Sequence, residues 1–513
     1  MLGFERVRDT RELIDAGIAN TGLADELDDR QTQRLLKIRR EWNFYEGYHW
    51  EGMPDVDTPE VTVNYCAAFV NKFVAFELGS GFTFTLHPDY EQTVVTQDGR
   101  TLFEYLEDVW EDNNQFIFAT EMGQMKSVTG DAWVQVRYFP ADELDDPFGE
   151  YPDGRLAILL HNTATIYPEY HPHQRNKVIR LSIIYNYYDY ERVGVLRKKT
   201  IKTLKTFKQV WTDKEVSTYY GTGTEPIVTP NRYGVIPFVQ VKNFVLAGRN
   251  DGVSDLDNII PMNVEYNLKK SNMSEILDYH AAPVTLVFGA KIGNLEKGAN
   301  KLWGGLPKDA KVQNLELNGD LGASKGYIDS LKVEMCEVSG VPETVLGGAQ
   351  SISNTSGVAL QYMNLPLIEK TKVKRASTED GLERLNKLIL LVSIFEGLIR
   401  FPDGATLRDF LHNEVTLPDT LPKDTLLELQ QIQLELQNDL ESRAGALKRL
   451  GRENIEEKIA EIDAEREKRN NEQLRMEQRQ QQLQQPQINS GFTNGETPQE
   501  TMNIALRGEN KSE

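Results

Sequence analysis

The sequence is poor in cysteine and in long apolar runs. Only Cys66 and Cys336 occur among 513 residues, too few for a disulfide framework, so the chain is expected to fold in a reducing compartment. The most apolar stretch, 388–395, lies between Lys387 and Glu396 and falls far short of the roughly 20 residues that a membrane span needs. The charged first residues do not fit a secretory signal. We expect a soluble protein made in the cytoplasm.

Positive charge is also scarce. The chain has 57 Lys and Arg against 78 Asp and Glu, which gives a formal net charge of -21 and a sequence pI near 5.0. An acidic protein repels nucleic acid at long range, and this excludes a simple adhesive nucleic-acid-binding module. It does not exclude a protein that handles DNA without holding it.

The motifs of common enzymes are missing. No G-x-x-x-x-G-K-[ST] phosphate loop is present, and the nearest stretch, 293–301, lacks the spacing and the hydroxyl residue. The motifs H-E-x-x-H, C-x-x-C and G-x-S-x-G are absent as well. His171 and His173 flank a proline, with His161 upstream, but a His-Pro-His turn favours a surface loop over a metal site. We predict no catalytic residues, no cofactor and no metal.

Apolar periodicity predicts an α+β fold. Helical spacing marks 30–48, 64–79 and 102–114, which end at or near Gly or Asn. From about 130 to 245 the sequence turns to short β-branched and aromatic runs separated by turn residues, typical of antiparallel strands. Helices followed by a β-rich region indicate α+β rather than a doubly wound α/β sheet.

Beyond Asp251 two helices flank a small insertion. A helix is expected from about Asp255 to His280, capped by Asp255 or Asp257, with Pro261 near its first turn. The insertion contains two short apolar strands separated by glycine turns, and a second helix ends at Gly340.

The last third begins with an uncharged loop. Residues 347–357 contain only Gly, Ala, Gln, Ser, Ile, Asn and Thr, which is typical of a flexible linker. A long helix should start near Ser356 and kink at Pro366, whose ring clashes with the carbonyl of Tyr362. Polar helices with narrow apolar stripes follow to about Arg469, and such helices usually need partners.

Three motifs follow one another along the chain. The first is Tyr45-Glu46-Gly47, at the end of the first predicted helix. The second is the segment 252–271, GVSDLDNIIPMNVEYNLKKS, in which a glycine, Ser-Asp-Leu and an apolar-Pro turn lead into a long helix. The third and most extended comprises Gly340-Val341-Pro342, Leu346-Gly347-Gly348, Ser356-Gly357-Val358-Ala359-Leu360, Leu367 and Lys370. In order and spacing the three resemble the portal proteins of long-tailed phages of Gram-positive hosts, and the resemblance spans about 30–470.

The resemblance implies a portal fold with a wing, a two-helix stem, a small α/β clip and a helical crown. In chain order it implies an N-terminal extension at 1–29, a wing at 30–250, stem helix 1 at 251–282, a clip at 283–323, stem helix 2 at 324–345, a tunnel loop at 346–356, a long kinked wing helix at 357–400, crown helices at 401–469 and a tail, expected to be disordered, at 470–513. The extension and the tail have no counterpart that assigns them a role.

The resemblance also implies an assembly and partners. Family members form rings, usually of twelve subunits, at one capsid vertex of the virion. They pass double-stranded DNA during packaging and ejection. The implied partners are the large subunit of terminase, head-completion or adaptor proteins at the clip, and scaffolding and major capsid proteins.

In this interpretation the uncharged loop lines the DNA channel, because each Lys or Arg there would add salt-dependent affinity for phosphate in every subunit. The alternative is an ordinary exposed linker. The predicted channel residues are Gly347, Gly348, Gln350, Ser351, Ser353, Asn354, Thr355, Ser356 and Gly357.

Two groups of basic residues have competing interpretations. Lys269 and Lys270 would present a basic ring to DNA, or they would form local pairs such as Glu265–Lys269. The denser cluster favours a solvated or intersubunit face over DNA contact; its residues are Lys370, Lys372, Lys374 and Arg375.

Two other functions stay open at the level of sequence. A minor capsid or head-morphogenesis protein would share the acidic composition, but it would not need two long helices around a small β insertion. A hydrolase that uses acidic residues is the more remote alternative.

Overall fold

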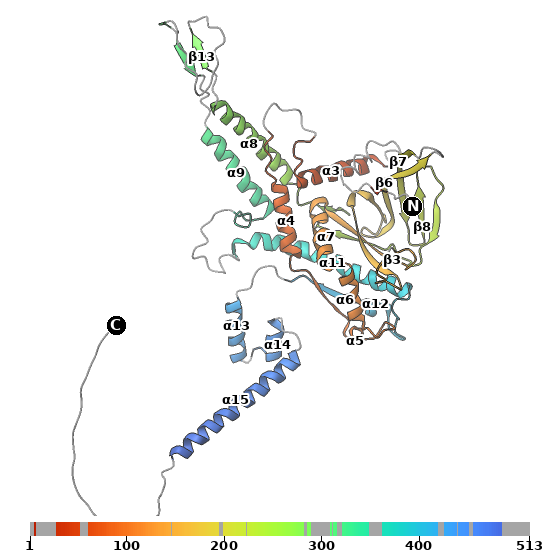
Figure 1. The fold of residues 1–513 in the computed structure, drawn as a ribbon, viewed down its shortest axis with the longest axis vertical. Coiled ribbons are helices and arrows are strands. Elements are labelled where there is room, and N and C mark those ends of the chain that lie inside the picture. The colour runs from red at the N-terminus through yellow and green to blue at the C-terminus, as the bar shows by residue number, and fades with distance from the viewer. Residues whose placement is uncertain are drawn as a thin grey trace, which may run out of the picture. The chain divides into compact units, whose positions relative to one another are not determined.

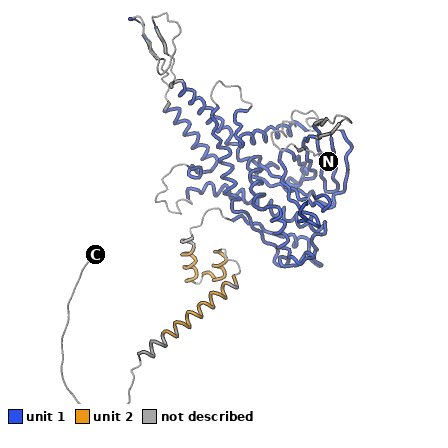
Figure 2. Tube along the Cα trace, in the orientation of Figure 1, with its two compact units in different colours: residues 1–422 blue, residues 423–513 orange. Residues whose placement is uncertain are grey.

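The computed structural model describes most of the chain in two compact units, residues 1–422 and 423–513 (Figure 2). The residues described are 5–6, 27–51, 60–144, 146–193, 199–221, 223–281, 285–288, 308–309, 311–314, 321–347, 362–418, 425–438, 440–450 and 455–484.

The first unit begins with four helices of ordinary length. Asp28 forms a capping box with Gln31 at the first, and Thr101 forms one with Glu104 at the third. The three predicted helices are confirmed, whereas the fourth, which ends at left-handed Gly130, was not predicted. The helices are α3 (Asp29–Glu46), α4 (Tyr65–Leu78), α6 (Leu102–Asp112) and α7 (Gln115–Thr129).

The β-rich region is antiparallel throughout its described pairs, as predicted. One sheet has the strand order β1-β6-β7-β8-β9 with β5 also on β6, and a second has the order β10-β3-β4. The strands of these two sheets are β1 (Glu5–Arg6), β3 (Asp131–Phe139), β4 (Arg155–His161), β5 (Ile166–Tyr170), β6 (Val178–Val193), β7 (Lys199–Trp211), β8 (Glu215–Tyr220), β9 (Ile227–Pro230) and β10 (Phe238–Lys242). The mixed helix and strand content confirms the α+β class.

Short elements complete the first unit. Two further two-stranded pairs join β11 with β12 and β15 with β2. These elements are β2 (Thr83–Leu86), α5 (Pro88–Glu91), a 3-10 turn (Thr163–Thr165), β11 (Phe244–Val245), β12 (Gly252–Val253), α12 (Leu407–Phe410) and β15 (Asn413–Thr416).

The 31-residue helix α11 (Leu365–Phe395) crosses the centre of the first unit (Figure 1). Its apolar face packs on β10, β3 and β15, and Leu382, Leu385 and Ile389 are fully buried there. Gly381 permits the close approach to β10, since a Cβ at this position would lie 2.9 Å from Cγ2 of Val241. The core of the unit therefore forms between a sheet and this helix.

Two helices, α8 (Ile259–Ala281) and α9 (Leu321–Ser339), run side by side, and the hairpin of β13 (Thr285–Phe288) with β14 (Lys311–Asn314) lies at their far end (Figure 1). Both helices and both strands match the sequence prediction. Three polar residues of α8, four positions apart, bond the backbone of 61–65 and so fix the helix to α4; they are Asn263, Asn267 and Ser271.

Three expectations for the last third need correction. The helix expected from Ser356 through a kink at Pro366 is interrupted: Tyr362 and Met363 are helical, Asn364 is a turn, and Pro366 lies in the first turn of α11. A proline in the first turn has no backbone bond to lose. The chain therefore turns at Asn364, before α11 begins, and the kink predicted at Pro366 does not form.

The predicted crown at 401–469 does not begin a separate unit. β15 pairs with β2, and Phe410 and Leu417 are buried in the main core, so the chain divides after Pro422. The first twenty or so residues assigned to the crown belong to the first unit because their apolar side chains complete its core.

The second unit contains α13 (Thr425–Gln437), α14 (Arg443–Arg449) and α15 (Ile455–Gln484). Because α15 continues to Gln484, the disorder predicted from 470 is wrong for 470–484. Glu, Gln, Arg and Lys are good helix formers even without an apolar face, and pairs such as Glu465–Arg469 support the helix.

Candidate functional site

The structure describes only one of the nine predicted channel residues. Gly347 has a φ of 88° with open space around it, and left-handed backbone of this kind suits glycine. The other eight predicted loop residues, from Gly348 to Gly357, lie outside the described residues. Their role in the channel stays a prediction.

Lys269 and Lys270 lie half-buried on α8, where each has a local partner. The Lys269 ammonium is 3.4 Å from Glu265, one turn away. The Lys270 ammonium lies 5.7 Å from the centre of the Tyr266 ring. These are the local pairs considered as the alternative to a basic ring, and the channel-facing role of both lysines remains a prediction.

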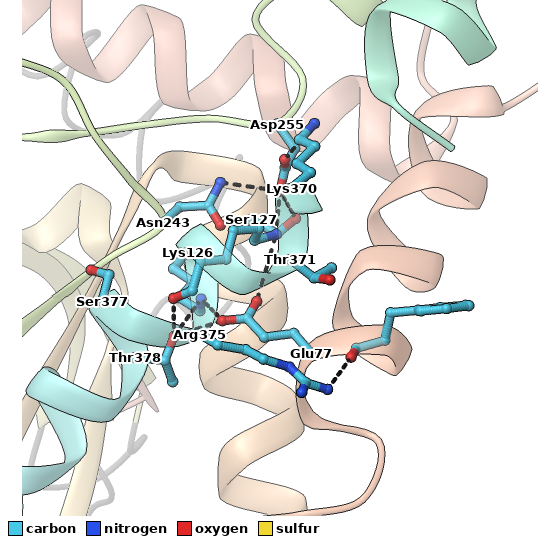
Figure 3. A network of polar contacts seen from close by, with 12 residues as sticks. Glu77, Lys126, Ser127, Asn243, Asp255, Lys370, Thr371, Arg375, Ser377 and Thr378 are labelled. Carbon is cyan, nitrogen blue, oxygen red and sulfur yellow. Dashed lines mark hydrogen bonds and ion pairs between the residues drawn. The ribbon is translucent and has the colours of Figure 1, made fainter. Parts of the chain in front are cut away.

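A buried charge cluster lies where α4, α7, α11 and the turn that precedes α8 meet (Figure 3). The buried charge cluster comprises Glu77, Lys126, Asp255 and Lys374, and the side chain of each is 0% exposed to solvent. The ammonium of Lys126 binds Glu77, and the Lys374 ammonium is 2.7 Å from Asp255 and 3.6 Å from Glu77. Four separate elements are thus joined by two carboxylates and two cations.

Neutral side chains add hydrogen bonds to one oxygen of each carboxylate, while Oε2 of Glu77 and Oδ1 of Asp255 have only the ion-pair contacts of Lys374 and Lys370. The Thr378 hydroxyl accepts from Lys126 at 2.8 Å and donates to Glu77 at 2.6 Å. Ser127 and Asn243 donate to Asp255 at 2.5 Å and 3.0 Å. Buried charge is tolerated when it is paired and hydrogen-bonded in this way.

Electrostatics keep both carboxylates of the cluster ionised. Burial raises the pKa of Asp255, but the ammonium groups of Lys374 and Lys370 outweigh it, so the pKa falls to about 2. Burial likewise opposes the charge of Glu77, and Lys126 and Lys374 still hold its pKa below the ordinary value. Burial lowers the pKa of Lys126, which Glu77 opposes, so the two ionised carboxylates hold the buried ammonium groups in their charged form.

The cluster corrects the prediction for the basic residues of 370–375. Lys374 is fully buried, and Lys370 contacts Asp255 at 3.3 Å and lies 4.1 Å from the centre of the Phe73 ring. Arg375 donates to the carbonyl of Phe76 at 2.8 Å. Of the four, only Lys372 is exposed. The physical reason is that Asp255 and Glu77, distant in sequence, supply the countercharges.

The histidines and acids examined for metal binding have local roles. Nδ1 of His171 accepts from the backbone N–H groups of His173 and Gln174 at 3.1 Å, which organises a turn. Asp255, expected as a helix cap, bonds side chains of the cluster instead. Within the described ranges, no group of three or more His, Cys, Asp or Glu is placed to hold a metal ion. The same residues include no helix that is long and apolar enough to cross a membrane.

The comparison with protein families matches residues 25–472 to the model described as phage portal protein, SPP1 Gp6-like. The chain belongs to the phage portal protein family. The match confirms the resemblance to portal proteins that the sequence motifs indicated, and the division into wing, stem, clip and crown stays a prediction. Portal proteins are structural proteins, and a portal or connector role follows from the membership. No curated protein matches this chain.

Two solved structures are similar to this portal-family chain. One is a chain of the virion of a native gene transfer agent particle, at 12% identity and a TM-score of 0.40. The other comes from the neck of an empty gene transfer agent particle computed with C6 symmetry, at 12% identity and a TM-score of 0.41. Each match covers 75% of this chain and 89% of the other.

The buried charge cluster joins the turn that leads into α8 to the helices α11, α4 and α7. Its charged groups are engaged in ion pairs with one another, which indicates a structural role. The predicted channel loop lies in the sequence between α9 and α11. The cluster therefore holds α11, the helix that follows the loop, against α4, α7 and the segment that leads into α8.

Proposed function

We propose that this chain forms a ring of twelve subunits, the DNA channel at one vertex of the capsid of a virion. The observation that carries the proposal is the pair α8 and α9 with the β13–β14 hairpin at its end, inside a family match of 25–472. A portal subunit requires such a stem and clip.

Exposed apolar side chains on the stem helices support ring formation. Leu277 on α8 and Tyr327, Val333 and Val338 on α9 are each about half exposed. A ring covers such residues, because each subunit packs its stripe against the next. The same reasoning applies to the narrow apolar stripes of the second unit.

The acidic composition supports a channel that does not retain DNA. With a net charge of -21 and an uncharged segment at 347–357, the ring would offer few cations to phosphate groups. The loop residues named above would line the narrowest part, and weak hydrogen bonds from Gln, Ser and Asn would exchange readily with water.

The proposed partners follow from membership in the portal family, and the lack of a phosphate loop in the sequence fits a separate motor protein. The chain would have no motor activity of its own and would dock the terminase large subunit at the clip, the segment 283–323. Head-completion or adaptor proteins would take the same place after packaging. Scaffolding and major capsid proteins would surround the wing.

The mass of the assembled particle tests the ring. Twelve copies of the 58.4 kDa chain give a particle of about 700 kDa, and images of it should show a central hole. A protein that stays at 58.4 kDa at micromolar concentration and forms no rings would contradict the proposal and favour a minor capsid protein.

A further inference from the structure

One phenylalanine side chain is almost fully exposed to solvent. Phe148, in the loop between β3 and β4, is 84% exposed, the highest value among the large apolar residues described. An isolated exposed aromatic is costly to hydrate and is enriched at interface centres. The loop around it holds six acidic residues and no basic one in 141–154.

The loop is held in place and presents Phe148 outward. The carboxylate of Asp146 accepts the N–H of Tyr151 at 2.7 Å. Gly149 takes a φ of 69°, which only glycine adopts readily. The Tyr138 hydroxyl donates to the carbonyl of Asp153 and ties the end of the loop to β3. An ordered loop loses little entropy when it binds.

A groove that could receive an aromatic side chain from an acidic loop lies elsewhere in the first unit, because its floor is apolar and its rim is basic. It has a volume of about 450 Å³ and runs between α11 and the β10 region. Its floor is apolar, with Val235, Ile236, Phe238, Leu388 and Leu391 among the lining residues. Val235 is 39% exposed, so the groove is open to solvent.

The rim of this groove is basic. Lys242, Arg384 and Lys387 line it against a single acid, Asp380, which pairs with Arg384 at 2.8 Å. Among the described residues, no carboxylate pairs with Lys387. Burial lowers the pKa of Lys242, so an approaching carboxylate would strengthen its charged form.

The loop lies beyond one end of the groove in its own subunit, and most of the groove extends away from it along β3 and β10. Trp133, which lines the groove, precedes the end of β3 at Phe139 by six residues, or about 20 Å along an extended strand. The bonds of Asp146 and Tyr138 keep the loop beyond that end. A second copy of the chain is thus the occupant that the charges and the shape indicate.

We propose that Phe148 of one subunit inserts into the groove between α11 and β10 of its neighbour, with the acidic loop facing the basic rim. Two different surfaces of the same chain meet in this contact, which makes it head-to-tail. Contacts of this type repeat around a closed ring. The inference rests on the proposed ring and assigns a contact that would hold it together.

Disulfide cross-linking tests the contact in the full-length chain. Phe148→Cys combined with Val235→Cys should give, on oxidation, a ladder of covalent multimers in denaturing gels, and each single variant should give none. The native thiols do not interfere, since Cys66 and Cys336 are buried and burial raises the pKa of each. Rings of full mass without a ladder would overturn the contact and leave the ring intact.

Assembly measurements give a second test. Phe148→Ser should raise the protein concentration at half-assembly about tenfold, as the loss of one apolar anchor per contact predicts. The matched control is Phe116→Ser on α7, where the side chain is 58% exposed and lies outside the groove. Arg384→Glu with Lys387→Glu should weaken assembly similarly, and Asp142→Lys with Glu143→Lys should restore it. A failure of these charge reversals to compensate would count against the proposed pairing.

Discussion

Glu77 is bound by both ammonium groups of the buried charge cluster, since Lys126 and Lys374 reach its carboxylate together with the hydroxyl of Thr378. Glu77→Gln leaves two buried ammonium groups with one carboxylate between them. Breaking a buried pair from one side costs about 3–5 kcal/mol, and we expect a loss of that size in the free energy of unfolding, measured with urea.

The control for Glu77→Gln is Glu121→Gln, an exposed position on α7, which should change stability by less than about 0.5 kcal/mol. Glu77→Leu with Lys126→Met removes both charges and should lose less than the single change, since Lys374 and Asp255 still balance. A single-variant loss near zero would contradict the role of the cluster.

Glu41 on α3 gives a pH-dependent prediction. Burial raises its pKa from 4.5 to about 8, and Lys37 opposes this only in part. A raised folded-state pKa means that the stability from this group is complete below about pH 4.5 and is lost as the pH rises through 8. Glu41→Gln should remove that loss and be more stable than the parent at pH 8 by a few kcal/mol, about the size that linkage gives.

Urea unfolding of both proteins between pH 4.5 and pH 8.5 checks the Glu41 prediction. The difference between variant and parent should grow with pH, and a difference that stays constant across this range would refute it. Subtracting the parent isolates Glu41, since the other titrating groups are common to both proteins.

Sequence patterns predicted which residues are charged but not which charges are buried. Lys374 looked like a surface residue because Glu77 and Asp255, its partners, are 297 and 119 positions away. The one local signal was the four-residue spacing of Lys370, Lys374 and Thr378, which places them on one face of α11. For Lys269, by contrast, the partner is one turn away, and the local pair with Glu265 could be foreseen.

At the scale of elements, α11 depends on a close approach to β10. Gly381→Ala would place a Cβ 2.9 Å from Val241, and overpacking of this kind costs about 1–3 kcal/mol. The matched control is Gly326→Ala, at an exposed position of α9 where an added Cβ would have no atom within 4 Å. This change should raise the free energy of unfolding by up to about 1 kcal/mol, because alanine favours helix. Urea unfolding distinguishes the two, and equal effects would show that contact with β10 is irrelevant.

The uncharged loop gives a prediction about DNA. Ser351→Lys with Ser353→Lys would add two cations per subunit, so the ring should retain double-stranded DNA at low salt and release it as salt rises. Retention is measured by filter binding at about 50 and 300 mM salt. Ser351→Asn with Ser353→Asn is the neutral control. Salt-independent retention by the lysine variant would place the loop away from the DNA path.

Element types were more predictable than their ends. Period-two and period-3.6 patterns located the strands of 131–220 and the helices α4, α6, α8 and α9. Helix α7 was missed because Phe116 and Ile117 at its start are exposed and blur the periodicity. Tertiary contacts decided the rest, since β15 is a strand because β2 offers it an edge. The boundary at 422 could not be read from composition.

At the scale of the whole molecule, the two units should separate by truncation. All described core clusters lie at or before Leu417, so a chain that ends at Pro422 keeps the full core of the first unit. The midpoint of its urea unfolding should match the midpoint at which the first unit unfolds in the full-length chain. The circular dichroism signal from the helices α13–α15 should disappear. A chain that fails to fold would show that the division at 422 is only geometric.

The truncated chain also tests where the ring is held together. The helices α8 and α9, the Phe148 loop and its groove all lie in the first unit, so the chain ending at Pro422 should still assemble, with the particle mass reduced by the 91 residues of 423–513 in each subunit. The polar helices of the second unit would then gain partners from the ring rather than create it. The opposite result would be a truncated chain that folds but stays monomeric while the full-length chain forms rings. That result would place the contacts that hold the ring together in α13–α15.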